Sequence, residues 1–188
     1  MYRFLFRTAL LVSFLAVAAC GGQQGEETVL NLPTGPDRAV AVLHAPDGSP
    51  RGTVTFTDTE EGVRVVADVR GLEPGAHGFH LHEYGDCTAS DFTSAGGHFN
   101  PTGAPHGGPD DPQHHAGDFG NIMVGEEGTG HAKLVSQMIS LDPGPASILG
   151  RAVIIHEGED DLESQPTGSA GGRAACGVVG RAPAPEEM

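Results

Sequence analysis

Residues 78–83, Gly-Phe-His-Leu-His-Glu, decide the fold, because two histidines alternate there with two large apolar residues. A period of two is typical of a β-strand, whose successive side chains point to opposite faces. His80 and His82 would then share a face, with Cα atoms roughly 6–7 Å apart at a rise of about 3.3 Å per residue. Two imidazoles at that distance can bind one metal ion, although a His-x-His pair alone is a weak signal.

Strand-like segments continue on both sides of this stretch. Turn residues such as Asp47-Gly48 and Glu61-Gly62 separate β-rich runs and favour hairpins. The chain has 29 Gly, 14 Pro and no Trp in 188 residues, which suits short strands and turns rather than helices. We therefore predict an all-β domain, an eight-stranded sandwich or barrel with strands at residues 39–43, 52–57, 63–69, 77–83, 121–124, 131–136, 150–156 and 175–180.

Two long loops interrupt this pattern, at residues 84–120 and 158–172. A long loop without periodicity inside a compact domain is usually functional or disordered, so we expect the chemistry to lie there. Imidazole and carboxylate groups, the ligands that zinc and copper use, gather in or beside the loops at His98, His106, His114, His115, Asp118 and His156. The plainer interpretation is a low-affinity metal trap, or simply polar filler.

The first residues have the character of an export signal. Arg3 and Arg7 precede an apolar run at residues 8–17, which is too short to span a bilayer. The run ends in Val-Ala-Ala-Cys, similar to a bacterial lipobox in which Cys20 becomes the lipidated N-terminus. An ordinary secretory signal with a free Cys20 is the alternative. We predict a lipoprotein signal peptide at 1–19, a lipidated cysteine with a flexible tether at 20–37, and one domain at 38–188.

Cysteine count and net charge limit the function further. Lipidation of Cys20 would leave Cys87 and Cys176 as an even pair in an exported chain. A bridge between them would close a long loop, worth roughly 4–5 kcal/mol in the chain-entropy model. Two free buried thiols are the alternative. The net charge of −15 argues against nucleic acid as a partner, because its phosphates would be repelled.

Six motifs, in order along the chain, resemble those of the copper–zinc superoxide dismutase family. They are Gly-Phe-His-Leu-His-Glu at 78–83, Ser-Ala-Gly-Gly-His-Phe-Asn-Pro at 94–101, His-Gly-Gly-Pro at 106–109, His-Ala-Gly-Asp at 115–118, Val-Ile-Ile-His-Glu at 153–157 and Gly-Gly-Arg-Ala-Ala-Cys-Gly at 171–177. The resemblance runs from about residue 39 to the end of the chain and implies a Greek-key fold. Cys87 after Gly85-Asp86 and the short second loop resemble the bacterial, periplasmic form.

The resemblance also implies roles for individual residues. The copper ligands would be His80, His82, His98 and His156. The zinc ligands would be His98, His106, His115 and Asp118, with His98 shared between the metals as a proton carrier. Asp160 would hold His80 and His106, Arg173 would guide an anion to the copper, and Thr167 would narrow the channel. His77 would be structural, and no role is expected for His44, His114 or His131.

The implied activity is disproportionation of superoxide to oxygen and hydrogen peroxide, with copper and zinc as cofactors. A cell-surface copper- or zinc-binding module without turnover is the alternative, since it would share the ligands without needing Arg173 or a shared His98. A purely structural domain that has lost its metals is a third possibility. We expect a lipid-anchored protein of the bacterial cell envelope, periplasmic or on the cell surface, whose membrane contact is the N-terminal anchor. The choice between monomer and homodimer stays open.

Overall fold

The structure, a computed structural model, describes residues 37–183. Within this range the chain forms eight strands and one short 3-10 helix, η1 (Thr93–Ala95). The predicted signal peptide, Cys20 and nearly all of the predicted tether lie outside the described residues. The strands are β1 (Arg38–His44), β2 (Pro50–Thr59), β3 (Gly62–Arg70), β4 (Gly75–His82), β5 (Asp118–Val124), β6 (Thr129–Ser136), β7 (Ala152–His156) and β8 (Arg173–Arg181).

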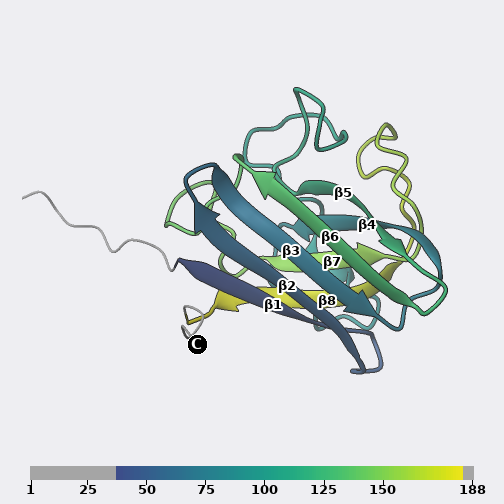
Figure 1. Cartoon of the computed structure of the whole chain (residues 1–188). Coiled ribbons are helices and arrows are strands. Elements are labelled where there is room, and N and C mark those ends of the chain that lie inside the picture. Colours follow the sequence, from purple (N-terminus) through teal and green to yellow (C-terminus); the bar gives the residue numbers. More distant parts are fainter. Residues whose placement is uncertain (1–36, 184–188) are drawn as a thin grey trace, which may run out of the picture. The chain divides into compact units, whose positions relative to one another are not determined.

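The eight strands close into an antiparallel barrel with the order β1-β2-β3-β6-β5-β4-β7-β8 (Figure 1). Hairpins join β1 to β2 and β2 to β3, at the two turns that the sequence predicts. The chain then leaves β3, which pairs with β6, and returns to form β4 and β5 on the far side of β6. This crossing gives the Greek-key topology and confirms the predicted all-β fold.

Most strands begin one or two residues earlier than predicted, and β5 begins three residues earlier, at Asp118. From the sequence, residues up to 120 are expected in the first loop. In the structure β5 starts at Asp118, because Asp118 pairs with His80 on the neighbouring strand β4. The sequence pattern missed this because Asp118 and the two residues after it are buried together, without the polar–apolar alternation of a half-exposed strand. The pairing brings the end of the loop directly against the histidine strand.

The core is built from the alternating faces of the strands. On β1 and β3 buried and less buried positions alternate, as expected for a sheet with one face packed inward. On β4 the side chains of Phe79 and Leu81 join the main apolar core, while His80 and His82 point to the opposite face. All four are buried, so the histidine face of β4 is covered by something other than the barrel interior.

The two long loops cover the histidine face of β4, and a disulfide holds the first loop in place. Cys87 and Cys176 are bridged, with their Cα atoms 5.9 Å apart, so the alternative of two free thiols does not hold. Phe92 and Ala95 pack with Ile154 and Cys176 in a second, smaller apolar cluster beside the bridge. The loop is thereby fixed to β7 and β8. In the part of the chain that the structure describes, we find no helix long and apolar enough to cross a membrane.

Candidate metal centre

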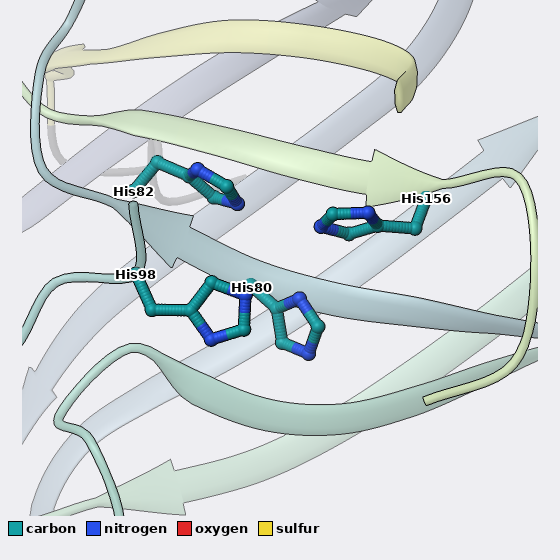
Figure 2. A group of neighbouring side chains, drawn as sticks. All are labelled: His80, His82, His98 and His156. Atoms are coloured by element: carbon teal, nitrogen blue, oxygen red, sulfur yellow. The ribbon is translucent and has the colours of Figure 1, made fainter. Parts of the chain in front are cut away.

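Four histidines from three parts of the chain meet on the covered face of β4. His80 and His82 lie on β4, His156 ends β7, and His98 lies on the first loop; Figure 2 shows their rings turned toward a common centre. One ring nitrogen from each of the four lies within 4.8 Å of the others. The two strands run side by side, with His80 opposite Ile154 and His82 opposite Ala152, which brings the end of β7 toward the His-x-His pair.

His98 reaches this centre because its segment continues the sheet for three residues. His82 and His98 form an isolated antiparallel bridge. On either side of it, Glu83 N donates to Gly97 O at 2.9 Å and Phe99 N donates to Leu81 O at 2.8 Å. A loop segment in an irregular, Gly-rich region is thus fixed by backbone hydrogen bonds, and its histidine ring is placed against the histidines of β4.

The outer hydrogen bonds of these rings determine which nitrogen faces the centre. Oxygen acceptors lie 2.7 Å from His80 Nε2 (Asp160 Oδ2), 3.0 Å from His82 Nδ1 (Gly96 O) and 3.2 Å from His156 Nδ1 (Gly171 O). A carbonyl or carboxylate oxygen only accepts, so each of these nitrogens carries the proton and donates. The lone pairs are left on His80 Nδ1, His82 Nε2 and His156 Nε2, which have no hydrogen-bond partner.

A second cluster surrounds the carboxylate of Asp118. Its oxygens lie 2.7 Å from His98 Nδ1, 3.1 Å from His106 Nδ1 and 3.2 Å from His115 Nδ1. The backbone N–H of His115 also donates to Asp118 Oδ2, at 2.9 Å. Because His98 belongs to this cluster through Nδ1 and its Nε2 has no partner, it is the residue that the two clusters share.

Both clusters are buried, and burial shows in the pKa values. Burial holds the pKa of His80 and of His82 well below the usual value, and it lowers that of His156 to about 4. For Asp118 burial acts in the raising direction, but the hydrogen bond and charge of His98 and His115 bring its pKa below the usual range. Neutral imidazoles and an ionised carboxylate are the forms that bind metal ions.

Asp160 connects the two clusters through the outer nitrogens of one histidine in each. Its Oδ2 accepts from His80 Nε2 at 2.7 Å, and its Oδ1 accepts from His106 Nε2 at 3.0 Å. Asp160 is 1% exposed, and it lies in the second loop, so that loop contacts one histidine of each cluster. A carboxylate behind a metal-binding imidazole fixes the tautomer and orientation of the ring.

The unpartnered atoms fit metal ions. Six buried ring nitrogens, all in the two clusters, have no hydrogen-bond partner among the described residues: His80 Nδ1, His82 Nε2, His98 Nε2, His106 Nδ1, His115 Nδ1 and His156 Nε2. Such orphaned polar atoms are costly unless something binds them. Around a tetrahedral zinc with ligands at about 2.0 Å, neighbouring donor atoms lie about 3.3 Å apart. The contacts of 3.1 and 3.2 Å at Asp118 are close to that spacing.

The guanidinium of Arg173 lies near two members of the four-histidine cluster, His82 and His156. Arg173, at the start of β8, donates to Phe92 O and to Gly96 O, so its side chain is fixed by two carbonyls of the first loop. Its charge also lowers the pKa of His82 and of His156, a smaller effect than that of burial. Arg173 lines a cleft of about 460 Å³ with Asp91, Thr93 and Glu157. Thr167 is half-buried in the second loop, and its expected channel role stays a prediction.

The remaining histidines lie outside both clusters. The ring nitrogens of buried His77 face two carbonyl oxygens, those of His156 and Glu73, each at 2.8 Å. His114 Nδ1 faces the His115 carbonyl oxygen at 2.8 Å. His44 is exposed, and His131 forms an exposed pair with Asp68 at 2.8 Å.

Sequence reasoning missed Asn121 and Gly168, which both support this site. Asn121 on β5 holds the backbone of Asp160 at both ends, accepting from Asp160 N and donating to Asp160 O, each at 2.8 Å. Gly168, at φ 68°, packs so closely that a Cβ there would lie 1.7 Å from Asp160 Oδ1 and 2.7 Å from His106 Nε2. A glycine beside a turn was the only sequence feature that could have drawn attention to Gly168. No feature of the neighbouring sequence indicates a supporting role for Asn121.

Comparison with known proteins gives one consistent result. The family model described as "Copper/zinc superoxide dismutase (SODC)" matches residues 50–179. The extracellular superoxide dismutase [Cu-Zn] of Brugia pahangi is 44% identical over 150 residues, covering 75% of this chain and 74% of that protein. Among solved structures, the clock protein EA4 has a TM-score of 0.73 and 44% identity, covering 80% of this chain and 98% of the other. A double mutant of a SOD-like protein from Bacillus subtilis has a TM-score of 0.69 and 38% identity, covering 74% and 95%.

Proposed function

This chain belongs to the copper/zinc superoxide dismutase family and is a superoxide dismutase with copper and zinc as cofactors, and from that premise we propose how its residues divide the work. His80, His82, His98 and His156 hold copper. His98, His106, His115 and Asp118 hold zinc. The observation that carries this assignment is the convergence of six unpartnered, buried ring nitrogens in two sets that share His98.

The reaction combines two superoxide ions and two protons into dioxygen and hydrogen peroxide. Bound copper would supply the redox chemistry, in which one superoxide ion gives up an electron and the next receives one. The chain's own contribution is a proton at a fixed place. His98 Nε2 faces the copper ligands, while Nδ1 is held at Asp118, 2.7 Å away. Nε2 has one lone pair, so it would carry a proton only while it does not bind copper, and a proton carried there would be positioned for delivery to the substrate.

Arg173 and Asp160 would serve the metal centre through different histidines. Arg173 places a positive charge and hydrogen-bond donors near His82 and His156, where they would attract the superoxide anion. Asp160 keeps the lone pairs of His80 and His106 directed inward by accepting their outer N–H groups. Thr167, in the same loop as Asp160, would narrow the approach.

The assignment is tested by loading the purified protein with copper and zinc and measuring metal content and superoxide turnover together. His82→Ala should lose copper and turnover while keeping zinc, because His82 belongs to the four-histidine set alone. His115→Ala should lose zinc first, because it belongs only to the set with Asp118. Loss of the opposite metal in either variant would contradict the two ligand sets.

A metal-binding module without turnover is not favoured. The same ligands would serve it, but a buffer needs no fixed guanidinium beside the metal. The comparison of wild type with Arg173→Ala separates the two, since only in an enzyme does that change lower turnover with both metals still bound.

For location, we propose a lipid-anchored protein of the bacterial cell envelope, periplasmic or on the cell surface. The support is the lipobox-like sequence ending at Cys20 and the Cys87–Cys176 disulfide, which is typical of exported proteins. The Brugia pahangi relative is named extracellular, in agreement with export. Metabolic labelling with a radioactive fatty acid tests the anchor: label should enter wild type and be absent from Cys20→Ser. Equal labelling of both would exclude Cys20 as the anchor.

A further inference from the structure

The backbone of His106 lies outside the β-strands, so no neighbouring strand supplies its hydrogen bonds. It lies in residues 103–109, a segment rich in Gly and Pro between the strands β4 and β5. Polar backbone groups in a partly buried setting need partners, and a strand would normally supply them. Here the partner is a side chain. Gln165 Oε1 accepts from His106 N at 2.8 Å, and Gln165 Nε2 donates to His106 O, also at 2.8 Å.

This two-point pair joins the two loops at a single residue. Gln165 belongs to the second loop and His106 to the first, 59 positions apart. Gln165 Nε2 also donates to Glu163 O at 3.2 Å, so the amide is oriented by its own loop before it meets His106. The ring of His106 is held in addition by Asp160, at 3.0 Å from Nε2. The second loop therefore fixes both the backbone and the ring of this histidine.

From this geometry we propose that Gln165 is a positioning residue of the metal centre. It holds His106 so that Nδ1 stays directed at the zinc set, and it thereby couples zinc binding to the order of residues 158–172. The inference depends on the proposed function, in which His106 binds zinc. Coupling of two events is reciprocal, so zinc should also order the loop. Gln165 does not touch the four-histidine set, so copper binding should be affected far less.

The residue type matters for this role. A glutamine amide offers one acceptor and two donors at the end of a side chain long enough to span both backbone groups. Asparagine keeps the amide but is one methylene shorter, and methionine keeps the length without the amide. Because Gln165 is exposed, water can replace its hydrogen bonds in the variants, and the barrel should still fold.

The test is zinc and copper titration of the metal-free protein against chromophoric chelators, with hydrogen exchange of residues 158–172 measured before and after zinc. Gln165→Met should weaken zinc binding about 10-fold, the low end for residues that support a ligand. Copper affinity should stay as in wild type. Zinc should slow exchange in residues 158–172 of wild type, and this protection should be lost in Gln165→Met. Gln137→Met, at an exposed glutamine just after β6, is the matched control and should behave as wild type.

The possible failures are distinguishable. Unchanged zinc affinity and protection in Gln165→Met would overturn the role of Gln165. Equal loss of zinc and copper affinity would also overturn it, since that indicates general loosening. His106→Ala tests the premise: if it binds zinc as wild type does, the ligand assignment fails instead. If Gln165→Met does not fold, Gln165→Asn carries the same expectations, and failure of both to fold would assign Gln165 to folding rather than positioning.

Discussion

Arg173 and His82 donate to the same carbonyl oxygen, that of Gly96, at 2.6 and 3.0 Å. The guanidinium and the His82 imidazole thus depend on one backbone acceptor, so a shift of the Gly96 carbonyl would disturb both. Gly96 has a φ of 75°, a conformation that favours glycine, so the shared acceptor depends on the Gly-rich sequence before His98. In the proposed assignment, this shared acceptor would set the position of the anion-attracting guanidinium relative to the copper ligands.

Replacing Arg173 should lower turnover without removing the metals. In Arg173→Ala we expect kcat/KM to fall about 10-fold or more, because a fixed charge that attracts the anionic substrate is lost. The kcat/KM of Arg173→Lys should lie between those of wild type and Arg173→Ala. Lysine keeps the charge, but it cannot reproduce the planar geometry in which arginine binds two carbonyls. Pulse radiolysis of the metal-loaded proteins measures the rate. Wild-type kcat/KM in Arg173→Ala at full metal content would show that the guanidinium has no part in substrate capture.

Removing the charge of Asp160 should weaken the metal centre itself. In Asp160→Asn an amide faces two ring N–H donors, and its NH₂ cannot accept from one of them. We expect metal affinity to fall 10–100-fold, roughly the range for such supporting groups, with both sites affected because His80 and His106 both lose their anchor. Competition with chelators measures the loss. Glu159→Gln removes the same charge from an exposed neighbour and should bind metals as wild type does.

The disulfide should contribute substantially to stability. Cys87 and Cys176 are 89 residues apart, and the bridge ties the first loop to β8. In the double variant Cys87→Ala/Cys176→Ala, the free energy of unfolding should fall by about 2–5 kcal/mol. Urea denaturation of the metal-free protein measures the change, and reduced wild type should show a similar midpoint. If oxidised wild type and the double variant unfold at one midpoint, the bridge does not stabilise the fold.

As the pH falls, the metal-free protein should lose stability already at pH values higher than those at which carboxylates titrate. Burial lowers the pKa of His156 to about 4, whereas an unfolded histidine titrates near 6.5. Between those values the unfolded state binds more protons, so stability is present above pH 6.5 and is lost as the pH falls toward 4. His80 and His82 shift in the same direction. Calorimetry across this range should show a falling Tm, and a constant Tm would contradict buried, neutral histidines.

Salt should affect the rate only weakly. The chain carries a net charge of −15 and a single lysine, Lys133, so its far field repels superoxide while Arg173 attracts it locally. Screening of exposed charges at physiological ionic strength reduces both effects. We expect kcat/KM to change little between low and physiological ionic strength. A steep fall would mean that long-range attraction dominates despite the net charge.

The fold could be predicted from sequence because its signals are local. Alternation around His80 and His82, and turns such as Asp47-Gly48, identify strands without knowledge of their partners. The start of β5 could not be predicted in this way, since Asp118 joins the sheet only through its pairing with His80. The candidate ligands followed from ordered motifs, but nothing in those motifs indicates Asn121 or Gln165, whose amides act on backbone groups far along the chain.

By itself, the sequence determined the strands, the histidine and aspartate inventory, and the family to which they belong. Sharing of His98 and support from Asp160 were already expected from the family motifs. Only the tertiary structure decided which ring nitrogens face inward and that Asn121 and Gln165 support the site. The physical reason is that strand periodicity depends on residues two positions apart. Ring orientation depends instead on acceptors such as Asp160, which lies 80 residues from His80 and reaches it only once the barrel has closed.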